Sequence, residues 1–207
     1  MIESTPISEL KYPVMEHFAT IQGEGFHAGT AAYFVRLGGC DVGCVWCDVK
    51  ESWPILGHPE MTSIEIADLV SKSGLKTVVI TGGEPTMHNL APLTRELKSR
   101  GIQTHIETSG TNALTGSWDW VTFSPKKFKA PVSGFGNLAS ELKIIVFNKS
   151  DFEFGETHAE NVHSQCELYL QPEWDRRNEI SDRLVAYVLL HSKWKISIQS
   201  HKYLNIP

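Results

Sequence analysis

The 207-residue sequence has no run rich in Lys and Arg, no apolar stretch of membrane-spanning length and no basic, apolar leader at its N-terminus. Nineteen basic and 24 acidic side chains give a net charge of −5, so direct binding to nucleic acid is not expected. Even its longest apolar segments are short, such as Tyr187 to Leu190, and no membrane span is predicted. Without a secretory leader, the protein is expected in the reducing cytoplasm.

Cysteine is also scarce, but three of the four cysteines stand close together. Cys40, Cys44 and Cys47 form the pattern Cys-x-x-x-Cys-x-x-Cys directly after two glycines. Thiolates are metal ligands, and one short loop can aim three of them at a common centre. A structural zinc needs a fourth protein ligand, and the next histidine, His58, does not follow at finger-like spacing. A four-iron cluster on three cysteines keeps one iron open for chemistry, which is the leading hypothesis.

Two other interpretations of these cysteines remain open at this point. One of the nine histidines could complete a zinc knuckle, which would make the chain a zinc-stabilised interaction module without chemistry of its own. The cysteines could also be small buried hydrophobes that bind no metal. The fourth cysteine, Cys166, lies far from the others and is expected to be a buried free thiol.

Short segments rich in β-branched and aromatic residues recur along the chain. They predict strands over residues 14–20, 31–37, 77–81, 103–108, 120–124, 141–147, 167–171 and 194–200. Helices are predicted from a capping box at Thr62–Glu65 to Gly74, from about 88 to 101 and from about 178 to 193. This alternation predicts one α/β domain over residues 1–207 with a mostly parallel sheet and a long loop at 126–138.

Polar and glycine-rich segments follow three neighbouring predicted strands. Residues 82–85 follow the strand at 77–81, Glu107 to Ser109 end the next strand, and residues 124–126 follow the one after. Enzymes with parallel sheets bind ligands at the carboxyl ends of their strands. These segments are therefore candidate ligand loops, with a tight turn and a solvated strand end as the alternatives.

The segment 40–47, including Trp46 just before the last cysteine, resembles the signature of radical S-adenosylmethionine enzymes. Motifs from Glu16 to the last residue also occur in the order found in 7-carboxy-7-deazaguanine synthases, at residues 20–25, 34–37, 81–85, 107–110, 124–126, 171–172 and 199–202. The resemblance implies a partial, helix-poor (βα) barrel, a [4Fe-4S] cluster on the three cysteines and S-adenosylmethionine on the open iron.

The resemblance also implies the reaction. Similar enzymes convert 6-carboxy-5,6,7,8-tetrahydropterin to 7-carboxy-7-deazaguanine with loss of ammonia, on the route to queuosine and other deazapurines. A 5′-deoxyadenosyl radical abstracts hydrogen from C6 of the substrate and the ring then contracts. A flavodoxin-like electron donor and a homodimer are expected. A second enzyme reading is an activase that installs a glycyl radical on a partner protein.

Binding roles for individual residues come from the same resemblance. The cofactor is expected to contact Trp46, Gly83, Glu84, Glu107, Ser109, Ser124, Pro125, Lys126, Gln171, Pro172, Glu173 and Trp174. The substrate is expected to contact Ile21, Gln22, Gly23, Glu24, Arg36, Thr81, His201 and Pro207, with residues 194–207 closing its site. From residue type alone, the alternatives are a polar turn at 22–24, a surface arginine, a structural histidine and a frayed tail.

One position departs from the family pattern. Members commonly carry Thr or Ser directly after the Cys-Asp pair, and its hydroxyl helps to hold a magnesium ion, whereas this chain has Val49. Valine has no oxygen for a hard cation. Either substrate and water hold the metal with help from Asp48, or the enzyme works without it, and Asp48 could instead cap the loop.

Overall fold

A computed structural model describes residues 10–207 and centres on one sheet of nine strands. The strand order is β3-β1-β2-β4-β5-β6-β7-β8-β9. From β2 to β9 all neighbours run parallel, whereas β1 is antiparallel to both β2 and β3. The predicted mostly parallel sheet is therefore confirmed. The strands are β1 Lys11–Ile21, β2 Ala31–Leu37, β3 Glu60–Thr62, β4 Thr77–Gly82, β5 Gln103–Thr108, β6 Trp120–Phe123, β7 Glu141–Val146, β8 Glu167–Pro172 and β9 Lys195–Ile196.

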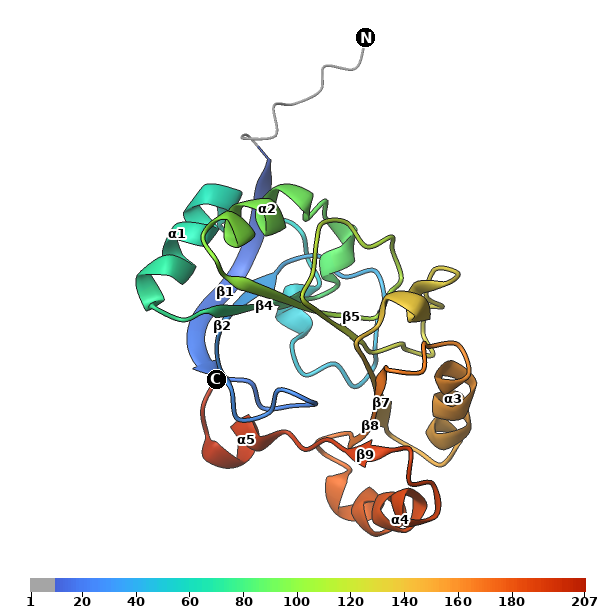
Figure 1. The fold of residues 1–207 in the computed structure, drawn as a ribbon. Helices are drawn as coiled ribbons and strands as arrows, with labels where there is room; N and C mark the ends of the chain where they lie inside the picture. The colour runs from blue at the N-terminus through green and yellow to red at the C-terminus, as the bar shows by residue number, and fades with distance from the viewer. Residues whose placement is uncertain (1–9) are drawn as a thin grey trace.

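The helices α1 to α4 lie on the outer side of an arc formed by the sheet (Figure 1). They are α1 Ser63–Ser73, α2 Ala91–Ser99, α3 Ser150–Ala159 and α4 Arg177–Leu190, and a short α5 spans Ser200–Leu204. Three 3₁₀ helices occupy Lys50–Ser52, Pro85–Met87 and Phe135–Leu138. The helix-poor α/β architecture expected from the sequence is present. No helix in residues 10–207 is long and apolar enough to cross a membrane.

Alternation along the strands separates the core from the inner face of the arc. Leu37, Ile80, Ile106 and Leu142 are fully buried in the apolar core, which the helices extend with Ile66, Leu93, Leu97 and Leu184. Because neighbouring side chains on a strand point to opposite faces, residues such as Arg36, Thr81, Glu107 and Lys143 lie on the other face, where they line a cavity. The inner face of the arc is therefore polar.

The helix boundaries follow local chemistry. The capping box predicted at Thr62 is present, with Glu65 N donating to Thr62 Oγ1 and Gly74 ending α1 in the left-handed conformation. The second helix begins at Ala91 rather than about residue 88, because residues 85–87 form their own 3₁₀ turn and Pro92 stands in the first helical turn. A proline suits that position because its missing N–H would have no partner there.

Three elements were absent from the sequence prediction, and one strand was wrong in extent. The predicted strand at 194–200 is reduced to the two residues of β9, with Ile196 and Ile198 exposed and the chain turning into α5. Helix α3 carries no apolar stripe, because its buried positions include Asp151 and Gly155 beside Phe152. The three-residue β3 and the five-residue α5 are too short for a periodic signal.

The C-terminal segment returns to the end of β1, where Figure 1 shows the chain terminus. Ser200 N donates to the Gly23 carbonyl oxygen at 2.9 Å, and Thr20 Oγ1 donates to the Pro207 carbonyl oxygen at 2.9 Å. Gly25 N donates to Ser197 Oγ, also at 2.9 Å. The open side of the arc is thus bridged by loop and tail contacts rather than by strand pairing.

Candidate functional site

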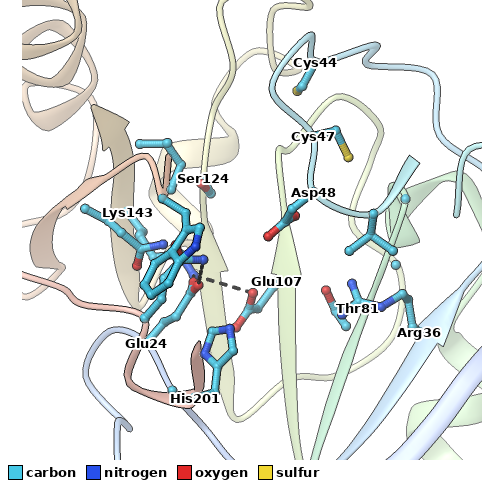
Figure 2. A pocket seen from close by; sticks show the side chains of 18 of the residues that line it. Glu24, Arg36, Cys44, Cys47, Asp48, Thr81, Glu107, Ser124, Lys143 and His201 are labelled. Carbon is cyan, nitrogen blue, oxygen red and sulfur yellow. Dashed lines mark hydrogen bonds and ion pairs between the residues drawn. The ribbon is translucent and has the colours of Figure 1, made fainter. Parts of the chain in front are cut away.

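A cavity of about 290 Å³ lies at the carboxyl ends of the parallel strands, where the sequence places its ligand loops. Its lining includes all three clustered cysteines, Asp48, Val49 and every predicted binding residue except Pro125. Figure 2 shows Cys44 and Cys47 above the cavity, Glu24, Lys143 and His201 on one side, and Thr81 and Arg36 on the other. The structure therefore brings together predicted binding residues that are up to 186 positions apart, from Ile21 to Pro207.

The cysteine loop presents three unpaired thiols to this cavity. Cys40, Cys44 and Cys47 are free, and burial raises the pKa of Cys44 to about 11 and also raises that of Cys40. In residues 10–207, no three His, Cys, Asp or Glu side chains converge as they would on a single metal ion. Three free thiols on one loop facing a common cavity are a donor set that fits a [4Fe-4S] cluster, which is larger than one ion. Cys166, by contrast, is buried elsewhere, as predicted.

The loop after β4 (residues 83–84) is hydrogen-bonded through its backbone to the residues that lead into the cysteine loop (residues 40–47). Gly83 N donates to the Leu37 carbonyl at 3.0 Å, and Glu84 N donates to the Gly39 carbonyl at 2.8 Å. A Cβ on Gly83 would lie 2.4 Å from the Gly39 oxygen and 2.6 Å from Cys40 Cβ. The glycine at this position is thus required by the close approach of two backbones as well as by any ligand.

Glu84 is buried and accepts hydrogen bonds from three residues of neighbouring loops. Oε1 accepts from Thr86 N at 3.1 Å, Thr86 Oγ1 at 2.6 Å and Thr108 Oγ1 at 2.5 Å. Oε2 accepts from Ser109 N at 2.8 Å and from Ser109 Oγ. This carboxylate joins the ends of β4 and β5, and a contact to the cofactor stays a prediction.

The long loop after β6 packs on the cysteine loop. Lys129 Nζ pairs with Asp41 Oδ2 at 2.5 Å. Phe128 meets Trp46 edge-on at 6.0 Å between ring centroids, and Lys126 Nζ lies 5.7 Å from the centre of the Trp46 ring. Burial lowers the pKa of Lys126 to about 8. Residues 126–134 form the predicted loop, whereas Phe135–Leu138 form a 3₁₀ helix, and Lys126 lines the cavity beside the thiols.

Five polar side chains form a hydrogen-bonded network on the side of the cavity nearest the C-terminal segment. Gln22 Nε2 donates to Glu107 Oε1 at 2.9 Å, and Gln22 Oε1 accepts from Glu24 N at 3.1 Å. Lys143 Nζ pairs with Glu24 Oε2 and lies 3.5 Å from Glu107 Oε2. Gln199 Nε2 donates to Glu24 Oε1 at 2.8 Å. Glu107, which was assigned to the cofactor, therefore contacts residues that were assigned to the substrate.

Lys143 and Gln199 were missed by sequence analysis. Lys143 stands in the otherwise apolar segment Leu142 to Val146 of a predicted buried strand. A lysine is almost never fully buried unless it is paired, so this position was the available signal. Gln199 stands in the segment 199–202 that carries the resemblance, but only His201 of that segment was given a role.

Arg36 and His201 are held in place from behind. Arg36 Nε donates to Glu16 Oε1 at 2.6 Å, which leaves its other nitrogens toward the cavity. His201 packs on Gly23, where a Cβ would lie 2.0 Å from its Nδ1. Burial lowers the pKa of His201 against the opposing effect of Glu24. Burial therefore favours the uncharged form of His201.

The residues after Cys47 do not fit a magnesium site made by the protein. Val49 supplies no oxygen, and Asp48 Oδ2 accepts from Lys202 Nζ at 2.8 Å. The charge of Asp48 is therefore paired with the ammonium group of Lys202. Lys202 also lies 5.2 Å from the Trp174 ring centre, so α5 contacts both the cysteine loop and the loop after β8.

Comparison with known proteins relates this geometry to a family. The Radical SAM superfamily pattern matches residues 34–123, which include the cysteine loop and the β4 loop. The chain is 52% identical to 7-carboxy-7-deazaguanine synthase of Flavobacterium psychrophilum over 195 residues, covering 94% of this chain and 92% of that protein. The chain belongs to the 7-carboxy-7-deazaguanine synthase family. The Synechocystis synthase is 47% identical over 97% of this chain and 98% of its own length.

A solved structure extends the likeness to three dimensions. The crystal structure of QueE from Escherichia coli matches with a TM-score of 0.83 and 32% sequence identity, covering 92% of this chain and 95% of that one. The fold, the family and the radical enzyme class expected from the sequence are confirmed. The cofactors of this member of the 7-carboxy-7-deazaguanine synthase family are a [4Fe-4S] cluster and S-adenosylmethionine. The free thiols of Cys40, Cys44 and Cys47 are the donor set that fits the cluster.

Proposed function

We propose that the chain converts 6-carboxy-5,6,7,8-tetrahydropterin to 7-carboxy-7-deazaguanine with loss of ammonia. The observation that carries the proposal is the 52% identity over nearly the whole length to a synthase of that name. The cavity supports it, because one polar chamber beside the three thiols is lined by all but one of the predicted binding residues.

Roles for the cavity residues follow from their chemistry and position. When bound and reduced, the cluster and S-adenosylmethionine supply a 5′-deoxyadenosyl radical. The loops at 83–84, 124–126 and 171–174 surround the cofactor, and the buried Lys126 ammonium adds positive charge there. Arg36 binds the substrate carboxylate with its planar guanidinium fork. His201 and Pro207 contact the same molecule from α5 and the tail.

The remaining parts of the proposal concern the surroundings of the site. Residues 1–207 form one domain whose segment 194–207 closes the substrate side. A flavodoxin-like protein supplies the electron, and the active form is a homodimer, the default of symmetric assemblies. Cluster thiols require a reducing compartment, which places the enzyme in the cytoplasm. Turnover proceeds without a protein-held magnesium ion, because Val49 and the Asp48–Lys202 pair leave no such site.

One anaerobic experiment tests the function. The protein is reconstituted with iron and sulfide, iron is counted per chain, and dithionite, S-adenosylmethionine and 6-carboxytetrahydropterin are added. We expect about four irons per chain, together with 7-carboxy-7-deazaguanine and released ammonia. A colourless, iron-free protein would contradict the radical chemistry. Cleavage of S-adenosylmethionine without any deazapurine would contradict the substrate and return the glycyl-radical activase to consideration.

A further inference from the structure

Lys143 is a buried cation between two carboxylates that face the cavity, and no sequence motif pointed to it. Its side chain is 4% exposed, and its ammonium pairs with Glu24 and lies 3.5 Å from Glu107 (Figure 2). Gln22 closes the circuit by bonding to Glu107 and to the backbone N–H of Glu24. Gln22, Glu24, Glu107 and Lys143 therefore form a ring that joins the β1–β2 loop, β5 and β7.

The ring fixes the charge of Glu24. Burial opposes the ionised form of Glu24, but Lys143 and Gln199 outweigh it and hold the pKa of Glu24 at about 2. For Lys143, burial is likewise outweighed by Glu107, Glu24 and Glu141, so its pKa rises. Without the ammonium, Glu24 loses the largest attraction that opposes burial, and its pKa rises.

Charge decides which kind of ligand this face can accept. An ionised carboxylate only accepts hydrogen bonds, whereas a protonated carboxyl also presents an O–H donor. One ammonium against two carboxylates leaves a net negative face lined by acceptor oxygens. Such a face is complementary to adjacent N–H donors, such as the 2-amino group and neighbouring ring N–H of an aminopyrimidinone. A 2-oxo analogue places an acceptor against it.

We propose that Lys143 is the positioning residue that holds Glu24 and Glu107 in alignment and keeps Glu24 ionised, and that it thereby sets the preference of the enzyme for a 2-amino heterocycle over its 2-oxo counterpart. The inference rests on the proposed function, since it concerns how that substrate class is recognised. Lys143 acts through the two carboxylates and needs no contact with the ligand.

Other charged groups face the ring and share in its titration. Glu141 lies two residues before Lys143 on β7, and burial raises its pKa while its Oε2 accepts from Phe26 N at 2.9 Å. Lys126 approaches from the end of β6, and His201 approaches from α5. Neither balances Glu24 as Lys143 does, because burial lowers the pKa of both Lys126 and His201 and so disfavours their charged forms.

The test compares two stable probes, 6-carboxypterin and 6-carboxylumazine, which differ in the 2-amino and 2-oxo group. Their dissociation constants are measured by anaerobic calorimetry on the reconstituted enzyme with S-adenosylmethionine bound. The wild type should bind the pterin at least about tenfold more tightly, and Lys143→Met should lose most of that ratio, because a charge-assisted hydrogen bond is at stake. Lys98→Met, whose lysine pairs with Asp119 outside the cavity, is the matched control and should keep the ratio.

The pH profile and a charge-conserving variant separate this role from a structural one. In Lys143→Met the pKa of Glu24 rises, so the affinity of the variant for the pterin, divided by that of the wild type, should fall as pH falls from 9 to 6, because the wild-type Glu24 pKa is about 2. The ratio is used because Lys126, with a pKa of about 8, titrates in the same range in both proteins. Lys143→Arg, which keeps the charge, should restore the pterin preference and make its affinity relative to the wild type independent of pH. If Lys143→Met does not fold, Lys143→Gln, which keeps a hydrogen-bond donor beside Glu24 without the charge, should show the same loss of the pterin preference.

The outcomes are distinguishable. If the wild type binds neither probe, the proposed substrate class is contradicted, and the role of Lys143 in recognising it is contradicted as well. The inference is overturned if the wild type prefers the pterin, Lys143→Met prefers it equally, and the affinity of Lys143→Met relative to the wild type does not change with pH. Equal weakening of both probes in Lys143→Met overturns it as well, because that result indicates general disruption of the cavity rather than altered recognition.

Discussion

At the scale of single residues, the site depends on carboxylates whose oxygens are already engaged by the protein. Glu84 is the clearest case, since its two oxygens accept from Thr86, Thr108 and Ser109. Glu84→Gln replaces an acceptor by an amide donor that faces other donors. We expect the free energy of unfolding to fall by about 1–3 kcal/mol, measured by urea denaturation of the cluster-free protein. Glu179→Gln, on the exposed face of α4, should change it by less than about 0.5 kcal/mol, and equal stability of the two variants would contradict the interpretation of Glu84.

Val49 and Lys202 carry the residue-scale prediction on metal dependence. Turnover of the wild type should agree within about twofold between chelator and added magnesium, because Val49 offers no oxygen and the charge of Asp48 is paired with Lys202. Val49→Thr combined with Lys202→Ala supplies a hydroxyl and frees Asp48, and this variant should bind Mn²⁺ in a spectroscopic titration and gain stimulation by magnesium. Strong stimulation of the wild type would contradict the metal-free proposal.

At the scale of elements, backbone approach at the end of β4 positions the cysteine loop. A Cβ on Gly83 meets backbone and not the tip of a flexible side chain, so the two loops must separate in Gly83→Ala. We expect a loss of about 1–3 kcal/mol in stability from overpacking, with fewer irons retained per chain after reconstitution. In α3, Gly155→Ala adds a Cβ at ordinary contact distances of 3.4 Å and should leave the iron content unchanged. Normal iron content in Gly83→Ala would show that this contact does not position the cluster ligands.

Elements and site differ in how far the sequence predicts them. The parallel strands and the ligand loops were predictable, because buried β-rich runs and the glycines after them are local signals. Lys143 was not assigned a role, because its partners Glu24 and Glu107 stand 119 and 36 positions away. Helix α3 was missed for a related reason, since Asp151 and Gly155 of α3 are buried by tertiary contacts and not by an apolar pattern. The strand at 194–200 was predicted, but only the two residues of β9 pair.

At the scale of the whole molecule, the C-terminal segment completes the cavity wall. Gln199, His201, Lys202 and Pro207 line it, and Pro207 accepts a hydrogen bond from Thr20. A tag added after Pro207 should raise the KM for the pterin about tenfold, the effect of losing one or two hydrogen bonds, with little change in iron content. The same tag placed before Met1 is the control, and undiminished kcat/KM in the C-terminally tagged enzyme would count against a role for Pro207.

The contact of Ser200 with Gly23 and the bond of Gln199 to Glu24 have a consequence for when the enzyme becomes competent. The thiols belong to the first quarter of the chain, whereas the opposite wall arrives with its final residues. A nascent or clipped chain can therefore expose its iron-binding loop without enclosing a pterin. The wall that faces the cysteine loop is therefore complete only after residues 199 and 200 have packed against the β1–β2 loop.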